Sequence, residues 1–243
     1  MNAGFRASLI EIWERGEALE PIDRALALLD WAHPGRDGAE LASFDICKRD
    51  VLLFLLHEKL FGRRAFLFQE CPRCATELEF ELDLQELQSD SSAESHTAFY
   101  KEKDTIIEYR APNSLDLARV AREFDSEESL LSLLKACVIS AQDANGNDRK
   151  NDLSELSLRK LGKDMEGRFP DLEISLLLDC PSCREKFRII FDIAEFLWTK
   201  ISRAARNLLQ ETATLARYYG WTESEILSLS DRRRKFYLEA MNA

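Results

Sequence analysis

The sequence predicts an α+β fold that is mostly helical, and three observations support this prediction. Apolar residues recur at helical spacing over most of the chain, as in Phe5, Leu9 and Ile12. Two short segments alternate instead with a period of two, which is the spacing of a half-exposed strand. Each of these segments contains a Cys-Pro-x-Cys turn, at residues 71–74 and 180–183. We therefore expect helices packed around two β-hairpins.

The N-terminal region, residues 1–62, is expected to be helical. Its strongest helix covers residues 45–61, "DICKRDVLLFLLHEKLF". Asp45 or Asp50 can accept hydrogen bonds from the N–H groups of its first turn, and Gly62 is a typical helix end. We expect this region to pack against the hairpins.

The two hairpins are predicted over residues 63–87 and 170–192. Apolar and charged residues alternate in both: Leu78, Phe80 and Leu82 with Glu77, Glu79 and Glu81, and Phe187 and Ile189 with Lys186 and Arg188. When the two segments are aligned, Cys71 and Cys74 match Cys180 and Cys183. The chain therefore repeats one strand–turn–strand unit. Each copy is expected to be followed by a helix start, at "DLQEL" and "DIAEF".

The region between the hairpins divides into two parts. Residues 88–112 are predicted to be a serine-rich loop followed by one or two strands. Residues 113–169 are predicted to be a helical insert. Its helices are expected at 113–124, capped by Asn113 or Ser114, at 126–141 and at 153–165.

The C-terminal region, residues 193–243, is predicted to be helical. Its elements are a long helix over 193–219 that ends at Gly220, a helix that begins with a capping box from Thr222 to Glu225, and a last helix capped by Ser230. Together with the preceding regions it is expected to form a single compact unit, residues 1–243.

Composition limits the classes of function. Hydrophobic residues make up 45% and charged residues 32% of the chain, as in a globular protein. The formal net charge of −11 argues against general affinity for nucleic acid, whose phosphates must be neutralised by Lys and Arg. No apolar run is long enough to span a membrane, and the N-terminus does not resemble a secretory signal. A cytoplasmic location is therefore expected.

The four cysteines of the two turns predict a metal site. A Cys-Pro-x-Cys turn between strands presents two thiolates at one place, and two such turns supply the four sulfurs of a structural zinc site. Such a closed site leaves no position for water and is not catalytic. Separate redox or disulfide roles are the alternative. A thioredoxin-type pair needs a helix N-terminus to lower the thiol pKa, however, and here strand-like sequence follows both pairs.

The distance between the two turns along the chain is unusual for a zinc ribbon. Residues 75–179 separate them, whereas ordinary ribbons leave about 15–20 residues. Closing so long a loop costs about 4 kcal/mol. A structural zinc site contributes on the order of 10–16 kcal/mol, so the metal can outweigh this cost. We therefore predict one Zn²⁺ bound by Cys71, Cys74, Cys180 and Cys183.

The C-terminal region also offers a surface for a partner. Tyr218, Trp221 and Phe236 are its candidate aromatic contacts, with Arg232 and Arg233 beside them. A second hypothesis makes the protein a zinc-ribbon regulator that binds nucleic acid through Arg232, Arg233, Arg234 and Lys235. No glycine-rich phosphate loop and no catalytic arrangement of His, Ser or Cys stands out. We therefore expect neither an enzyme nor a small-molecule substrate.

Several motifs in this order resemble one family. They are "IEIWERG", "PIDRALALL", "KRDVLLFLLHEKLFG", "CPRC", "YRAPNSLDLA", "CPSC", "FDIAEFLW" and "LARYYGWTESEILSLSDRRRKFYLE". The sequence resembles the baseplate-hub assembly protein family of T-even-type contractile-tailed phages, which is also found among the baseplate genes of bacterial extracellular contractile injection systems. The resemblance spans nearly the whole chain.

The resemblance implies a non-enzymatic assembly factor, or chaperone, or else a minor structural component. Such a protein would bind a hub, spike or tape-measure subunit while the baseplate forms, and could remain in the finished particle. The four cysteines of the paired turns would carry over as its zinc ligands.

Overall fold

The computed structural model describes residues 3–87, 96–121 and 126–241. Its fold is α+β and mostly helical with small antiparallel sheets, so the predicted fold class is confirmed. Residue contacts divide the chain into two compact units, Met1–Trp31 with Ala194–Ala243 and Ala32–Ile193. The single compact unit expected over residues 1–243 stays a prediction. The predicted serine-rich loop lies, apart from His96, outside the described residues.

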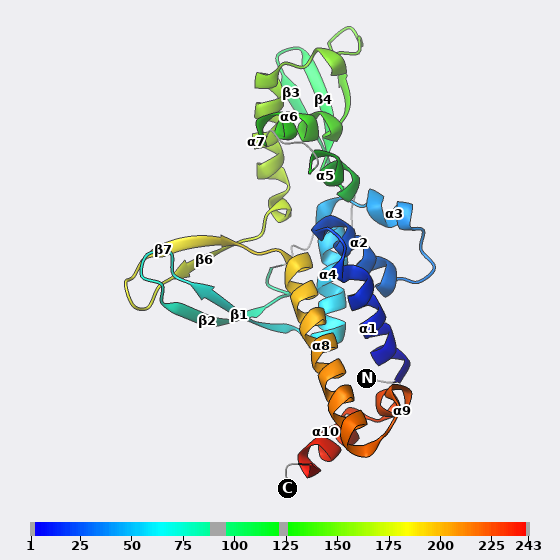
Figure 1. Cartoon of the computed structure of the whole chain (residues 1–243). Helices are drawn as coiled ribbons and strands as arrows, with labels where there is room; N and C mark the ends of the chain where they lie inside the picture. Colours follow the sequence, from blue (N-terminus) through cyan, green and yellow to red (C-terminus); the bar gives the residue numbers. More distant parts are fainter. Residues whose placement is uncertain (1–2, 88–95, 122–125, 242–243) are drawn as a thin grey trace. The chain divides into compact units, whose positions relative to one another are not determined.

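The first unit is helical (Figure 1). Its elements are α1 (Ala3–Glu17), α2 (Pro21–Ala32), α8 (Ile193–Tyr219), α9 (Glu223–Ser228) and α10 (Asp231–Ala240). The long helix α8 has the predicted bounds. Gly220, which follows it, has a φ of 69°, and glycine adopts this left-handed conformation without steric cost. Thr222 and Glu225 form the predicted capping box, and Ser230 caps α10 as expected.

Helix α1 approaches α8 closely because residue 16 is glycine. A Cβ atom at Gly16 would lie 2.5 Å from two ring atoms of Trp198. The Trp198 ring is buried. The guanidinium of Arg24, a residue of α2, lies 4.7 Å from the centroid of this ring. The ring is therefore held by neighbours and has little room to move away from an added methyl group.

Replacing Gly16 by alanine is expected to destabilise the protein by about 1–3 kcal/mol, because the Trp198 ring or the helix must shift. Thermal unfolding followed by circular dichroism measures this. Gly167→Ala is the matched control: Gly167 is also helical, and a Cβ there meets nothing within 4 Å. Alanine at residue 167 is expected to be neutral or slightly stabilising. Equal melting temperatures for the two variants would contradict the close contact.

The second unit begins with two helices, α3 (Gly38–Ser43) and α4 (Ile46–Phe61). Of the two candidate caps for α4, the structure uses Asp45, whose carboxylate accepts a hydrogen bond from the Lys48 N–H at 2.9 Å. Asp50 lies inside the helix and pairs with Arg49 at 2.7 Å. Gly62 ends α4 with a φ of 88°, as predicted.

A three-stranded antiparallel sheet and three helices form the middle of this unit. The sheet has the order β3 (Thr97–Glu102), β4 (Thr105–Arg110), β5 (Val138–Gln142), and the helices are α5 (Ser114–Val120), α6 (Ser126–Cys137) and α7 (Glu155–Arg168). Figure 1 shows α6 and α7 beside the sheet. Together they enclose a core that includes Ile107, Tyr109, Val138, Leu158 and Leu161. Two short 3₁₀ helices follow β5 and α7: η1 (Lys150–Asp152) and η2 (Pro170–Leu172).

Strand β5 corrects the prediction of a helix over residues 126–141 and of a purely helical insert over 113–169. The helix ends at Cys137, and Val138 pairs with Tyr109 of β4 at a bulge in the register. The two β-branched residues Val138 and Ile139 favour a strand. The free edge of β4 supplies the hydrogen bonds that this strand needs.

Two separate hairpins complete the unit, as expected. They are β1 (Arg64–Glu70) with β2 (Glu77–Asp83) and β6 (Ser175–Asp179) with β7 (Lys186–Ile190). The strands of each hairpin are antiparallel. After the second hairpin α8 begins as predicted, but residues 84–87 form a turn and not the expected helix start.

Candidate metal centre

The two cysteine turns have the same backbone structure. In the first, the Cys71 N–H donates to the Thr76 carbonyl and the Ala75 N–H donates to the Cys71 carbonyl, both at 2.9 Å. In the second, the Cys180 N–H donates to the Glu185 carbonyl and the Arg184 N–H donates to the Cys180 carbonyl, again both at 2.9 Å. Ala75 and Arg184 also share a positive φ, 57° and 58°. The repeat seen in the sequence is therefore a repeat of conformation.

The turns bring the four thiols together. Cys71 Sγ lies 3.7 Å from Cys183 Sγ, and Cys74 Sγ lies 3.6 Å from Cys180 Sγ. All four sulfurs lie within 4.8 Å of one another. A tetrahedron of sulfurs at about 2.3 Å from a zinc ion has edges of about 3.8 Å, whereas a disulfide is about 2.05 Å long. The spacing fits ligands of one metal ion.

Contacts outside the sulfurs hold the turns in this arrangement. Arg73 of the first turn forms an ion pair with Glu185 of the second at 3.1 Å. The inner faces of the hairpins share a small core, in which Leu78 is buried and Phe80 and Phe187 are partly buried. Cys71 and Cys180 are buried, Cys183 is half-buried and Cys74 is exposed. The sulfur cluster therefore lies at the surface end of a packed interface between the hairpins.

Hydrogen bonds prepare the cluster for a cation. The side chain of Thr76, together with its backbone, lowers the pKa of the Cys74 thiol to about 6, which favours its ionised form. At Cys183 the backbone hydrogen bond of Glu185 lowers the pKa, but burial and the neighbouring thiols outweigh it and raise the pKa to about 12. A thiolate surrounded by thiols is a ready ligand for a soft cation, which displaces the remaining protons.

The two remaining cysteines are not part of this cluster. Cys47 and Cys137 are both buried, and burial raises the pKa of each thiol to about 12. Cys47 lies near Asp45 and His96, a group that the sequence analysis did not identify. Asp45 Oδ1 accepts a hydrogen bond from the Lys48 N–H and lies 3.1 Å from His96 Nδ1, within hydrogen-bonding distance. This arrangement is explained as a helix cap with a hydrogen-bonded histidine.

The predicted partner residues lie in the first unit, within a set of contacting rings that we call the aromatic surface. Its members are Tyr218, Tyr219, Trp221, Phe236 and Tyr237, with neighbouring ring centroids 4.6–5.7 Å apart. Tyr219 and Trp221 are stacked, and the other ring pairs meet edge to face. Tyr237 belongs to the last helix, whose Phe236, Tyr237 and Met241 the sequence predicts to dock on a core or a partner. Tyr219 was not singled out, although it adjoins Tyr218. Tyr218 and Phe236 are 62% and 64% exposed.

The basic residues nearby differ in their accessibility. Arg232 and Arg233 are exposed. Arg234, which the nucleic-acid hypothesis requires, is buried and bonds to Glu211 and Asp231 at 3.0 and 2.9 Å. Of the four basic residues that the nucleic-acid hypothesis requires, Arg234 is therefore engaged in ion pairs inside the unit.

In the described part of the chain, no helix combines the length and the apolar character that crossing a bilayer requires.

Comparison with known proteins bears on the identity of the chain. A search of curated proteins and a search of solved structures both found no match. A family model described as T4 bacteriophage base plate protein matches residues 36–198. This range is more than half of the chain and contains both cysteine turns together with nearly the whole of the second unit. The chain therefore belongs to the T4 bacteriophage base plate protein family.

Proposed function

We propose that this protein is a non-enzymatic assembly factor or minor structural component of a phage-type baseplate, and that it binds another baseplate subunit. The family match over residues 36–198 is the observation that carries the proposal. Hub, spike or tape-measure proteins are the expected partners, in a phage or in a related contractile injection system. The protein acts in the cytoplasm, where such particles assemble, and takes no small-molecule substrate.

One structural Zn²⁺ is part of this proposal. Cys71, Cys74, Cys180 and Cys183 would hold it, because their sulfur spacing matches the edge of a zinc–sulfur tetrahedron. The ion would join two cysteine turns that are more than a hundred residues apart along the chain, in the range covered by the family match. A two-stranded hairpin is marginally stable by itself, so this bond gives both hairpins a fixed shape.

The aromatic surface is the proposed contact with the partner subunit. Exposed aromatic side chains bury a large area with little loss of conformational freedom, and interface hot spots are enriched in them. Tyr218 and Phe236 present their rings to solvent, while Trp221 stacks on Tyr219 with ring centroids 4.6 Å apart. Arg232 and Arg233 add exposed cations beside these rings.

Co-purification tests this function. The tagged full chain, expressed with the neighbouring gene cluster, is expected to retain a baseplate subunit that mass spectrometry identifies. Tyr218→Ser combined with Phe236→Ser is expected to weaken that binding by roughly tenfold or more, because two exposed aromatic contacts are lost. Leu156→Ser, at a residue that is 63% exposed on α7, is the control and is expected to retain the subunit.

The outcomes separate two parts of the proposal. If the wild-type chain retains no baseplate subunit, the assembly role is wrong. If it retains one and the double variant binds equally well, the role stands but the aromatic surface is not the contact.

Binding to nucleic acid is the alternative function, and two observations disfavour it: the net charge of −11 and the burial of Arg234. We expect no salt-dependent shift of DNA or RNA in a mobility assay at low ionic strength. A shift that weakens steeply with added salt, and that Arg232→Ala with Arg233→Ala abolishes, would favour the alternative.

A further inference from the structure

The outer faces of the two hairpins are unlike each other. Residues directly opposite in an antiparallel pair share a face. On the outer face of the first hairpin, Phe66 lies opposite Glu81 and Phe68 lies opposite Glu79. The two phenylalanines are 52% and 68% exposed. We call Phe66, Phe68, Glu77, Glu79 and Glu81 the acidic face.

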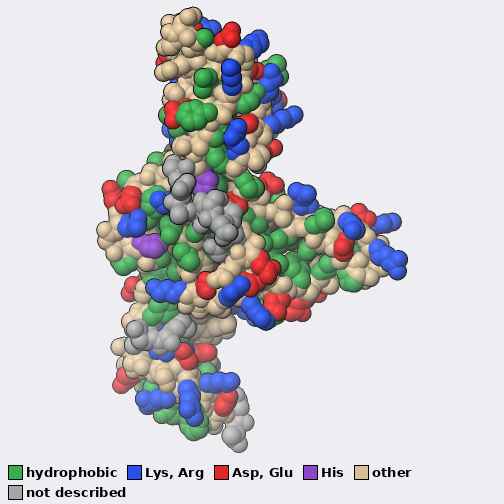
Figure 2. Space-filling model, turned by 180° about the vertical axis from the view of Figure 1, so that it is seen from behind, with side chains coloured by type: hydrophobic (Ala, Val, Ile, Leu, Met, Phe, Trp, Pro, Cys, Tyr) green, Lys and Arg blue, Asp and Glu red, His purple; other side chains and the backbone are tan. Residues whose placement is uncertain are grey.

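The second hairpin carries a net positive charge on its outer face, from Lys186 and Arg188 against Asp179. Leu177 lies opposite Arg188, and Lys186 lies opposite Asp179. Leu177 and Ile190 are both 67% exposed, so this face also presents two large apolar side chains to solvent. We call Leu177, Lys186, Arg188 and Ile190 the basic face. Figure 2 shows hydrophobic and charged side chains next to one another on the surface of the hairpins.

Two of the three carboxylates on the acidic face have no counter-ion among the described residues. Glu81 pairs with Arg64 at 3.2 Å. Among the described residues, however, no basic group lies within ion-pair distance of Glu77 or Glu79. Glu77 also lies directly opposite Glu70, and like charges placed opposite each other in a sheet destabilise it. A cation supplied from outside the chain would relieve this repulsion.

The basic face has cations to offer. Arg188 donates to the Ser175 hydroxyl at 3.1 Å, and among the described residues it has no carboxylate partner. Lys186 lies 3.7 Å from Asp179, but both side chains are largely exposed, so that this pair is weak. Both cations therefore remain able to meet a carboxylate from another molecule.

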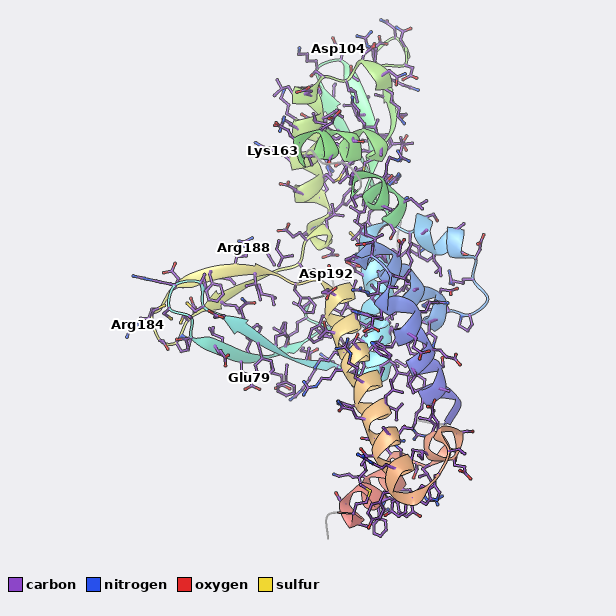
Figure 3. All side chains as sticks on the ribbon, in the orientation of Figure 1. Glu79, Asp104, Lys163, Arg184, Arg188 and Asp192 are labelled. Atoms are coloured by element: carbon purple, nitrogen blue, oxygen red, sulfur yellow. The ribbon has the colours of Figure 1, made fainter. Side chains whose placement is uncertain are left out.

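The two faces of one chain cannot meet each other. The hairpins pack through their inner faces, where Leu78, Phe80 and Phe187 lie, so that their outer faces point in opposite directions. Figure 3 shows Glu79 and Arg188 on opposite outer sides of the paired hairpins. Each outer face can therefore meet the outer face of the other hairpin only in a second copy of the chain.

We propose that the acidic face of one chain binds the basic face of a second copy. Each face has two exposed apolar side chains and a row of charges of one predominant sign, and the signs are opposite. The contact is heterologous, since it joins two different surfaces, and both surfaces of every added copy remain usable. Such contacts generate a closed ring or an open row. This proposal does not depend on which baseplate subunit the aromatic surface binds.

The contact is small, because each face belongs to a two-stranded hairpin. Interfaces well below the standard size associate weakly unless other contacts add to them. We therefore expect reversible association at micromolar or higher concentration, which salt weakens by screening the exposed charges. In an assembling particle, contacts with other subunits would raise the effective concentration of this one.

Sedimentation velocity of the zinc-loaded full chain tests the proposal. The weight-average sedimentation coefficient is expected to rise with protein concentration and to fall with added salt. Glu77→Lys with Glu79→Lys, and separately Lys186→Glu with Arg188→Glu, are each expected to weaken association by roughly tenfold or more, because like charges then face each other. An equimolar mixture of the two variants is expected to associate again, since the intact basic face of one meets the intact acidic face of the other.

Two controls separate this effect from a loss of folding or from net charge. Glu77→Lys places a lysine opposite Glu70, so the first variant is expected to melt no lower than the wild type. Glu128→Lys with Glu166→Lys makes the same change in charge at exposed positions of α6 and α7, and is expected to leave association unchanged. A wild-type monomer at every concentration would overturn the proposal, as would failure of the mixture to associate.

Discussion

Replacing Cys180 by serine is expected to remove bound zinc and much of the stability of the chain together. Cys180 is buried, and its sulfur lies 3.6 Å from that of Cys74, in the other turn. A four-thiolate zinc site contributes on the order of 10–16 kcal/mol to folding, and a hydroxyl is a poor replacement for one of its ligands. We expect the free energy of unfolding to fall by about 4 kcal/mol or more.

Two measurements on the same samples check this expectation. Elemental analysis gives the zinc content, which should be one ion per wild-type chain and far less in the variant. Chemical denaturation gives the stability. A chelator should lower the stability of the wild type towards that of the variant, because both then lack the metal.

Cys47→Ala is the matched control for a buried cysteine outside the cluster. Cys47 is 2% exposed, so its loss is expected to cost about 1–2 kcal/mol through the cavity that it leaves, with zinc content unchanged. If Cys180→Ser retains full zinc occupancy, the two turns do not share an ion. If it loses zinc but unfolds like the wild type, the metal does not stabilise the fold.

Replacing Asp116 by alanine is expected to be the second most disruptive change, at about 3 kcal/mol. Asp116 is buried and accepts two hydrogen bonds from Arg110 of β4, at 2.6 and 3.1 Å. It also accepts the N–H of Asn113 at 2.9 Å, which completes the capping box of α5. Its loss leaves a buried N–H without an acceptor and a guanidinium, 30% exposed, without a counter-ion.

The expected cost stays below that of a fully buried pair, because water reaches part of Arg110. Urea unfolding measures it. Asp152→Ala is the matched control, since Asp152 pairs with Arg149 at 3.4 Å and both side chains are about half exposed. That change is expected to cost less than about 1 kcal/mol. Similar costs for the two variants would show that the Arg110 pair adds nothing to stability.

Features that depend on neighbouring residues were predictable from the sequence. The caps at Asp45, Thr222 and Ser230, and the helix end at Gly220, lie where expected because each depends on hydrogen bonds within one turn of the chain. The α+β class followed from the change of period between helical and strand segments. The equivalence of the two cysteine turns was also visible, since each turn is a local structure with the same residues.

Features that depend on distant residues were not predictable. Residues 138–141 continue an apolar helical pattern, yet they form β5 because β4 offers a free edge. The nucleic-acid hypothesis required Arg234 at the surface, yet it is buried because Glu211 and Asp231 lie within reach of its guanidinium. In both cases the partner comes from another element. The β-branched residues Val138 and Ile139 favour a strand, but the sequence around them does not show that β4 offers an edge for it.

The sequence by itself determined most of the helices and both hairpins, where most of them begin and end, and that four thiols occupy equivalent turns. Only the tertiary structure decided that Cys71 approaches Cys183 while Cys74 approaches Cys180, and that the acidic and basic faces of the hairpins are both exposed. The physical reason is range. Capping, turn geometry and periodicity act over a few residues, whereas the meeting of two sulfurs or two faces depends on how whole elements pack.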